Sequence, residues 1–257
     1  MGPYDQQTEQ NIQRVIDSIY ENISERITID DMARTAMFSK FHFTRLFQRM
    51  TGVSPGRFLS AVRLQEAKKL LLSTGLSVTE ISHRVGYSSV GTFSSRFKSS
   101  VGLAPTAYRE LHGYAPYISD DRRFRLHTAV VQGEICAPPE PLEDGDEPGP
   151  VFLGLFPDTI PQGHPASCAV LRRPGRFRLD RAPEGTWYLL AQSVRPGEED
   201  VLSPRPPLVA VHGPVSVRPG RVIAPLNLQL RPMRVLDPPI LLALLDARRV
   251  ALGAVAS

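Results

Sequence analysis

The sequence predicts an all-α domain of two tandem helix-turn-helix units followed by an all-β, sandwich-like domain. Three observations support this: the distribution of proline, an internal repeat and a basic surplus in the first half. Of the 24 prolines, only four lie in the first 116 residues. Helix interiors exclude proline and loops between strands tolerate it, so the first half should be helical and the second mostly β. We expect a helix-turn-helix domain at residues 1–113, a linker at 114–124 and a β-sandwich at 125–257.

Start and stop signals divide the first half into helices. Apolar residues recur at helical spacing over Ile12–Ile23, which predicts one amphipathic helix. Ser77 with Glu80 three residues later forms a capping box, and Thr28-Ile29-Asp30-Asp31 is a similar start. Pro55 and Pro105 are each expected at the first position of a helix. The helix from Pro55 is expected to end near Ser73, with Gly75 as a left-handed stop.

These signals recur because the segment is duplicated. Residues 27–33 match residues 76–82 at an offset of 49, and the offset becomes 50 after the turn. The later matched pairs are Phe43 with Phe93, Phe47 with Phe97, Gly52 with Gly102, Pro55 with Pro105, and Phe58 with Tyr108. Each copy is typical of a helix-turn-helix, whose second helix fits a major groove. The joining helix, about 18 residues or about 27 Å long, approaches the spacing of about 34 Å between successive major grooves.

Charge is unevenly distributed between the two halves. Residues 26–109 hold 13 Lys/Arg against four Asp/Glu, whereas residues 117–257 hold 16 of each sign. A basic domain beside a neutral one indicates that only the first meets a polyanion. Charge alone fits a solvated basic face equally well, so the inference depends on the repeat.

Residues 10–110 resemble the DNA-binding module of the AraC/XylS transcriptional regulators. In the first copy the matching residues are Ile29, Met32, Ala33, Ser39, Phe41, Phe43, Arg45, Phe47, Gly52, Ser54, Pro55 and Phe58. In the second copy they are Ile81, Val85, Gly86, Tyr87, Ser88, Ser89, Phe93, Phe97, Lys98, Gly102, Pro105, Tyr108 and Arg109. The resemblance covers about two fifths of the chain and implies that its function is transcription regulation.

The resemblance implies that the first recognition helix reads bases. Its predicted DNA-facing residues are Lys40, Phe41, His42, Thr44, Arg45 and Gln48. Positions 41, 44 and 45 are those that approach bases in the family. Arg45 suits a bidentate contact to guanine, and Phe41, where the family commonly has tryptophan, suits a thymine methyl group. His42 is expected to contact a phosphate or to pack.

The second recognition helix departs from the family. Its groove-facing positions hold Val90, Gly91 and Ser95, which offer little hydrogen-bonding capacity, and Arg96 lies one position from the usual arginine. We therefore expect this helix to contribute mainly phosphate contacts. The DNA-facing residues predicted here are Ser89, Gly91, Thr92, Ser94, Ser95, Arg96 and Lys98.

The second half has the pattern of short strands. Residues 177–180, 215–218 and 226–231 alternate apolar with polar side chains, which predicts an antiparallel sandwich. Residues 175–189 loosely resemble transthyretin-like or carboxypeptidase-regulatory-like sandwiches, a fold with many uses. No cysteine or histidine pair has metal-ligand spacing, and no nucleophile elbow, phosphate loop or paired-carboxylate motif occurs. We therefore expect no enzyme activity, metal or cofactor.

Taken with the resemblance, these features predict a bacterial cytoplasmic transcriptional regulator, with no signal peptide or membrane span. Its expected partners are double-stranded promoter DNA and RNA polymerase. The β domain is expected to bind a small-molecule effector, to form a homodimer, or both. Two alternatives stay open: a DNA-tethered enzyme or carbohydrate-binding sandwich, and a ligand-independent regulator whose β domain only dimerises.

Overall fold

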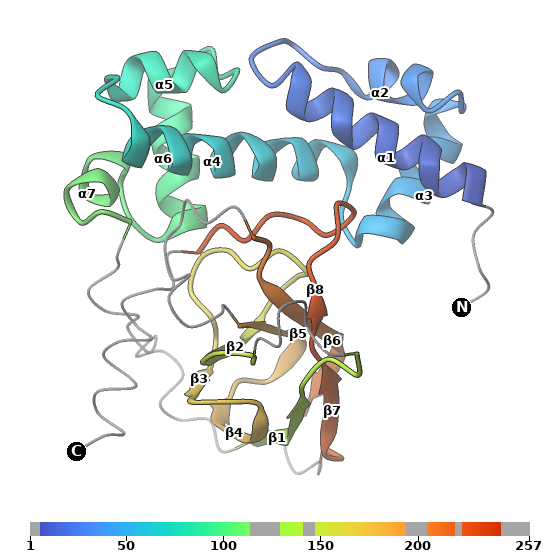
Figure 1. Cartoon of the computed structure of the whole chain (residues 1–257), viewed down its shortest axis with the longest axis vertical. Coiled ribbons are helices and arrows are strands. Elements are labelled where there is room, and N and C mark those ends of the chain that lie inside the picture. The colour runs from blue at the N-terminus through green and yellow to red at the C-terminus, as the bar shows by residue number, and fades with distance from the viewer. Residues whose placement is uncertain (1–5, 114–128, 141–146, 194–204, 219–222, 243–257) are drawn as a thin grey trace. The chain divides into compact units, whose positions relative to one another are not determined.

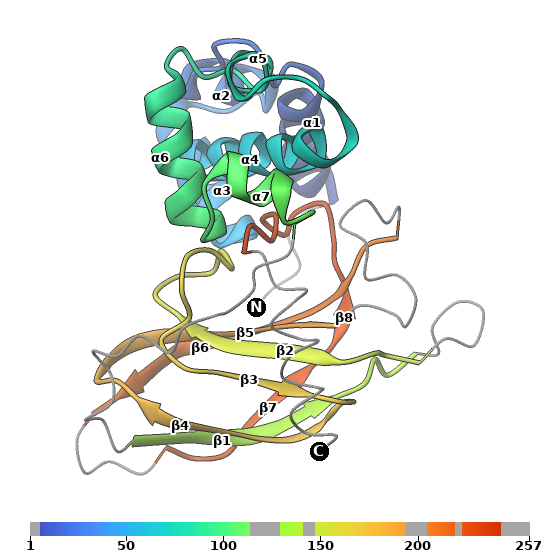
Figure 2. The same ribbon diagram turned by 90° about the vertical axis from the view of Figure 1, so that its left-hand side faces the viewer.

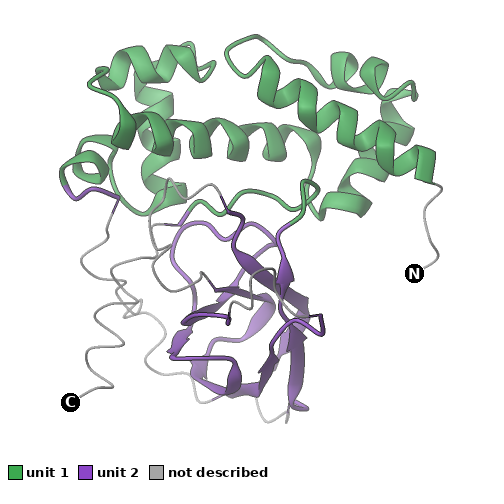
Figure 3. Cartoon of the chain, in the orientation of Figure 1, with its two compact units in different colours: residues 1–110, 234–241 green, residues 111–233, 242–257 purple. Residues whose placement is uncertain are grey.

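The computed structural model describes residues 6–113, 129–140, 147–193, 205–218 and 223–242. It confirms a helical region followed by β-sheets. The chain forms two compact units, coloured separately in Figure 3. The helical unit comprises residues 1–110 and 234–241, and the β unit comprises residues 111–233 and 242–257. The predicted linker, residues 114–124, lies outside the described residues.

Seven helices make up the described part of the helical unit, and α4 is its central rod (Figure 1). Helices α1 to α3 lie at one end of α4 and α5 to α7 at the other. The bounds are α1 Gln6–Glu21, α2 Ile29–Thr35, α3 Lys40–Thr51, α4 Pro55–Ser73, α5 Val78–Arg84, α6 Val90–Val101 and α7 Pro105–Glu110. Within the described ranges, no helix is both long and apolar enough to span a bilayer.

The start of each short helix is set by its own side chains. Thr28 and Ser77 close reciprocal capping boxes with Asp31 and Glu80. Hydrogen bonds from Thr28 lower the pKa of Asp31, and those from Ser77 lower the pKa of Glu80. The charged carboxylate is therefore the favoured form of Asp31 and of Glu80. The two capping boxes confirm the predicted starts of α2 and α5.

The helix α4 ends where the sequence predicts, but the predicted capping residue is wrong. The helix ends at Ser73 as expected, but its cap is Thr74 in an extended conformation, and Gly75 has no positive φ. The guanidinium of Arg109 instead donates to the carbonyl oxygens of Leu71 at 3.0 Å and Leu76 at 2.6 Å. Arg109 thus satisfies the Leu71 carbonyl, one of those that the last turn of α4 leaves unpaired, and the Leu76 carbonyl just beyond the helix.

Two equivalent aromatic clusters form the cores of the two helix-turn-helix copies. Phe47 stacks against Phe43 at 5.5 Å and against Phe58 at 5.4 Å between ring centroids. At an offset of 50, the Phe93–Phe97 and Phe97–Tyr108 distances are 5.6 and 5.5 Å. All six rings are fully buried. Each edge-to-face or tilted pair adds about 0.5–1.5 kcal/mol beyond its buried area, so these clusters fix each recognition helix on its scaffold.

The described part of the β unit is a sandwich of a three-stranded and a five-stranded sheet, seen as two layers in Figure 2. The strand orders are β4-β1-β7 and β3-β2-β5-β6-β8. The strands are β1 Ala129–Cys136, β2 Val151–Phe156, β3 Cys168–Leu171, β4 Gly175–Ala182, β5 Gly185–Ser193, β6 Leu208–Val217, β7 Leu226–Gln229 and β8 Arg231–Pro232. Of the segments predicted to be strands, 177–180 lies within β4 and 215–217 within β6. The predicted strand 226–231 is divided at Leu230 between β7 in one sheet and β8 in the other.

The core of the β unit lies between its sheets. Val131, Leu153, Leu179 and Leu189 are among the buried residues contributed by both layers. Trp187 packs against this core and donates its indole N–H to the carbonyl of Pro183 at 2.9 Å. The sheets are antiparallel except where β1 pairs with β7 in parallel, a pairing that strand alternation does not reveal.

Candidate nucleic-acid interface

Helices α3 and α6 present matching exposed faces. From position 41 to 50 and from 91 to 100 the sequence of exposed, half-buried and buried residues is the same at every step but one. At the exceptional step Leu46 is buried whereas Arg96 is exposed. A repeated burial pattern on two helices with the same aromatic anchors means that both helices present the same side to solvent.

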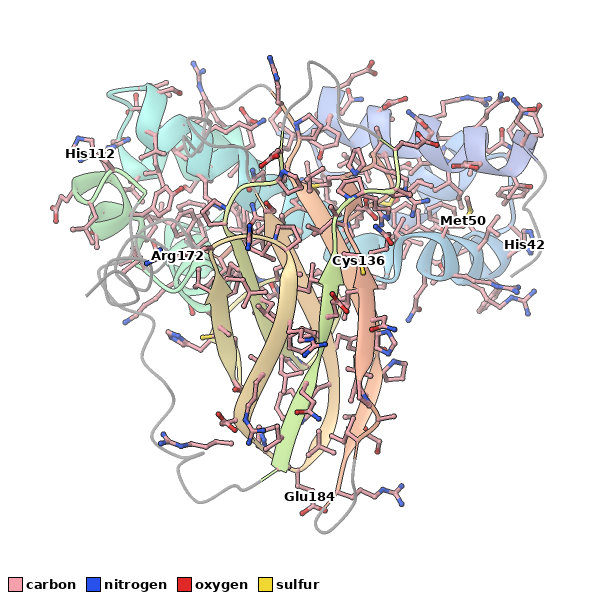
Figure 4. The ribbon with its side chains drawn as sticks, turned by 60° about the horizontal axis from the view of Figure 1, so that its bottom comes forward. His42, Met50, His112, Cys136, Arg172 and Glu184 are labelled. Atoms are coloured by element: carbon pink, nitrogen blue, oxygen red, sulfur yellow. The ribbon has the colours of Figure 1, made fainter. Side chains whose placement is uncertain are left out.

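On α3 the predicted base-reading residues lie on the exposed face. Phe41 is 89% exposed, and Arg45, Gln48 and His42 are also exposed. Full burial of a phenylalanine side chain is favourable by about 1.5–3 kcal/mol, so the exposed ring of Phe41 is available for an apolar contact. Figure 4 labels His42 on α3 at the periphery of the helical unit.

Two of the predicted α3 residues already have partners within the helical unit. The ammonium of Lys40 lies 2.9 Å from a carboxylate oxygen of Asp30, in an ion pair between α3 and α2. Thr44 is half-buried and donates its hydroxyl to the carbonyl of Lys40 at 2.9 Å. Thr44 therefore offers its oxygen as an acceptor, whereas Arg45 keeps an exposed guanidinium.

On α6 the predicted residues are short, apart from two cations. Gly91, Thr92, Ser95, Arg96 and Lys98 are exposed. Ser94 is half-buried, like Thr44 at the equivalent position. Ser89 is the N-cap of α6, and its hydroxyl accepts from the backbone N–H of Thr92 at 3.4 Å. The exposed face of α6 therefore carries positive charge but few side chains long enough to reach base edges.

Helix α4 sets the distance between the two copies. Its 19 residues correspond to about 28 Å at 1.5 Å per residue. Arg63 on α4 donates to the carbonyls of Ile23 at 3.1 Å and Glu25 at 2.5 Å, just beyond α1. One turn earlier on α4, the hydroxyls of Ser60 and Tyr87 lie 3.4 Å apart. Side-chain contacts from both copies thus hold α4 in place.

Sequence reasoning did not identify three cationic residues of the helical unit that bond to distant parts of the chain. Arg63, Lys68 and Arg109 all bond to backbone carbonyls, and the closest of these carbonyls along the chain is 33 residues away. Neither helical periodicity nor capping patterns report contacts at such separation. The only local sign for Arg109 is its position in the family motif.

The comparisons with known proteins agree on the helical unit. A family model described as a helix-turn-helix domain matches residues 32–111. The chain is 32% identical over 98 residues to the transcriptional activator AarP of Providencia stuartii, which covers 38% of this chain and 73% of that protein. It is 31% identical over 100 residues to the lactose operon transcription activator of Staphylococcus xylosus, which covers 39% of this chain and 36% of that protein.

Solved structures match the same share of the chain. An AraC-type regulator from Chromobacterium violaceum is 26% identical, covers 42% of this chain and 96% of its own, and has a TM-score of 0.40. The DNA-binding domain of AdpA, solved with a target DNA, is 28% identical over 40% of this chain and 92% of its own, with a TM-score of 0.39. The match spans only about a third of the length of the lactose operon activator, and the family model ends at residue 111.

The helix-turn-helix match, the duplicated recognition helices and the likeness to AarP over nearly three quarters of its length lead to one conclusion. The chain belongs to the AraC family of helix-turn-helix, DNA-binding transcriptional regulators.

Proposed function

We propose that the protein regulates transcription by binding promoter DNA as a single chain, with α3 and α6 in successive major grooves. The observation that carries this proposal is the repeat of burial and aromatic packing on two helices joined by α4. The length of α4, about 28 Å, is close to the groove repeat of about 34 Å. RNA polymerase is the expected partner of the bound complex.

Base readout is assigned to α3. The guanidinium of Arg45 is exposed, and an arginine in the major groove donates two hydrogen bonds to guanine. Phe41, the most exposed aromatic residue among those described, is suited to a thymine methyl group. Gln48, exposed one turn beyond Arg45, is assigned to an adjacent base or phosphate. His42 is exposed beside Phe41, its ring lies 5.0 Å from that of Phe38, and it is assigned to a phosphate.

Backbone contacts are assigned to α6. Arg96 replaces the buried Leu46 of the first copy, so it lies at the flank of the exposed face. A guanidinium at this position is placed for a phosphate beside the groove, as is the exposed ammonium of Lys98. The hydroxyls of Thr92 and Ser95 complete a surface that recognises phosphate and sugar rather than sequence.

The test begins with selection of bound duplexes from random DNA by the full chain. Affinities of wild type, Arg45→Ala and Arg96→Ala are then measured on a selected duplex and on a scrambled one over a range of salt. Arg45→Ala should lose about 1–3 kcal/mol on the selected duplex only. Arg96→Ala should weaken binding to both duplexes equally and should reduce the slope of log affinity against log salt concentration by about 1.

Arg178→Ala on β4 is the matched control, because it removes an exposed arginine from the β unit. It should leave both affinities and the salt slope unchanged. An equal loss on both duplexes for Arg45→Ala overturns the assignment of base readout to α3. Absence of salt-dependent affinity for any duplex overturns the proposed function.

The β unit is assigned a regulatory role, through a small-molecule effector, self-association or both. The support is that the β unit is compact and has its own hydrophobic core. Sedimentation of the full chain tests self-association. Thermal shift against a panel of sugars and small metabolites tests effector binding, since a sensor gains stability from its ligand without turnover. Turnover of a stabilising compound would favour the enzyme alternative.

A further inference from the structure

A short segment from the far end of the sequence belongs to the helical unit. Residues 234–241 follow β8 directly yet group with residues 1–110 (Figure 3). The chain then returns to the β unit at Leu242, whose N–H donates to the carbonyl of Pro161 at 3.0 Å. The segment is therefore attached to the β unit at both ends.

The segment starts with a compact turn and carries two buried leucines. The N–H of Asp237 donates to the carbonyl of Arg234 at 3.0 Å, and the N–H of Arg234 donates to the Asp237 carboxylate at 2.7 Å. Leu236 is buried and Leu241 is only 1% exposed, and neither belongs to the core cluster between the β-sheets. Val235, which lies between Arg234 and Leu236 in the sequence, is 45% exposed. The segment thus buries Leu236 and Leu241 while it leaves Val235 exposed to solvent.

Lys68 on α4 contacts this segment. Its ammonium nitrogen is buried and donates to the carbonyl of Ile240 at 3.1 Å. Burial lowers the pKa of Lys68 to about 7. A buried amine is unfavourable without a hydrogen-bond partner, and the Ile240 carbonyl supplies one.

The face of α4 that carries Lys68 is buried by neighbouring residues. Ala61, Leu64 and Lys68 are spaced i, i+3 and i+7, so they share one face of the helix, and all three are buried. Buried residues occur on the other faces of α4 as well. A helix with buried residues on several faces depends on more than one neighbour for its position, and the segment at Lys68 is one of them.

We propose that residues 234–241 form a strap on α4 that fixes the spacing between the two recognition helices. The strap is a positioning element of the DNA-binding unit, and this inference rests on the proposed function. With the strap docked, α4 is held along the face of Lys68 and the two copies keep one separation. With the strap released, α4 loses that support and the separation between α3 and α6 varies.

The first test measures docking without DNA. In the full chain, an amine-reactive acylating reagent is applied and modification is quantified by mass spectrometry. Lys69, the next residue and 46% exposed, is the internal reference. We expect Lys68 to react at least about tenfold more slowly than Lys69 in wild type, because reaction requires local opening. In Leu241→Asp the two lysines should react at similar rates.

Val235→Asp is the matched control, because it places the same charge at an exposed position of the same segment. It should keep the protection of Lys68. Leu241→Ala is the milder second variant, which removes apolar contact without adding charge and should give partial loss of protection. If Leu241→Asp loses helix by circular dichroism while the control stays folded, the helical unit needs the strap, and Leu241→Ala is used for the second test.

The second test measures spacing on DNA. The probe is a duplex selected from random sequence by the full chain, together with derivatives carrying one or two inserted base pairs between the two contacted grooves. In wild type one inserted base pair should weaken binding by about tenfold, or 1.4 kcal/mol. In the strap variant this ratio should fall to less than about threefold, and Val235→Asp should keep the wild-type ratio.

The outcomes separate the two proposals. If wild type binds no duplex, the proposed function fails, and the acylation test still reports on docking. If wild type binds DNA and Leu241→Asp keeps both the protection of Lys68 and the wild-type spacing ratio, the strap inference is overturned. If the wild-type protein binds the original duplex and the duplexes with inserted base pairs equally well, the strap inference is also overturned.

Discussion

Met37 and Gly86 occupy the same backbone position in the two helix-turn-helix copies. They are 49 residues apart and both left-handed, with φ of 58° and 80°. In each copy this residue and the next bond back to the preceding helix: Met37 to Arg34 and Phe38 to Ala33, then Gly86 to His83 and Tyr87 to Ser82. The same turn is thus built once on glycine and once on a residue with a Cβ atom, which disfavours this conformation.

Met37→Gly should stabilise the protein. Met37 is 68% exposed, so its replacement removes little packing. Relief of the left-handed strain, which is about 1–2 kcal/mol, outweighs the added chain entropy of glycine, so we expect a net gain of about 0.5–1 kcal/mol. Urea unfolding of both proteins measures it. A loss of stability would show that the methionine side chain contributes packing that its exposure does not indicate.

Gly86→Ala should destabilise the protein by about 2 kcal/mol or more. A Cβ at this position would lie 2.5 Å from a guanidinium nitrogen of Arg63 and 2.6 Å from the Ile23 carbonyl oxygen, in addition to the positive φ. Gly56→Ala is the control, since a Cβ there meets nothing within 4 Å in the first turn of α4. The control should gain about 0.5–1 kcal/mol in urea unfolding. Equal effects of the two substitutions would contradict the close approach of Arg63 to this turn.

Ser95→Arg should give α6 a base preference. Ser95 lies 50 residues after Arg45 and is exposed at the equivalent step of the repeated pattern. An arginine there should favour guanine at one position by about 1–3 kcal/mol, measured by repeating the selection from random DNA. Ser216→Arg, at an exposed position of β6, adds the same charge to the β unit. A general gain in affinity without a new preferred base would contradict placement of this face of α6 in a groove.

Lys68→Met should change how stability depends on pH. The pKa of Lys68 falls from 10.5 to about 7 on folding, so between these values the unfolded chain binds more protons than the folded one. Stability of wild type relative to Lys68→Met should therefore rise with pH above 7, by roughly 2–3 kcal/mol at about pH 9. Below pH 7 the buried charge is fully present and Lys68→Met should be the more stable protein.

Urea unfolding across this pH range measures the difference. Lys69→Met is the control, because it removes the neighbouring exposed amine and its surface ion pair with Glu66, and it should shift stability by less than about 0.5 kcal/mol. A stability difference between wild type and Lys68→Met that stays constant with pH would show that the amine is solvated in the folded protein.

Much of the helical unit could be predicted from local sequence. The capping residues Thr28 and Ser77 act on backbone groups three residues away, and the paired phenylalanines at 43 and 47 lie one helical turn apart. Such interactions join residues that are close in the sequence, so a short stretch of sequence is enough to predict them. The exposed face of α3, with Phe41 and Arg45, follows from the same periodicity because burying Phe43 and Phe47 turns the other side outward.

The amino-acid sequence by itself determined that a helical half precedes a β half, the duplication and the face that each recognition helix exposes. Only the tertiary structure decided that Thr74 rather than Gly75 caps α4 while Arg109 bonds to carbonyls around its end. It also decided that β1 and β7 run parallel and that residues 234–241 join the helical unit at Lys68. The physical reason is separation along the chain. Periodicity and caps depend on neighbours within a few residues, whereas the carbonyl that Lys68 contacts is 172 residues away and is brought to it only by folding.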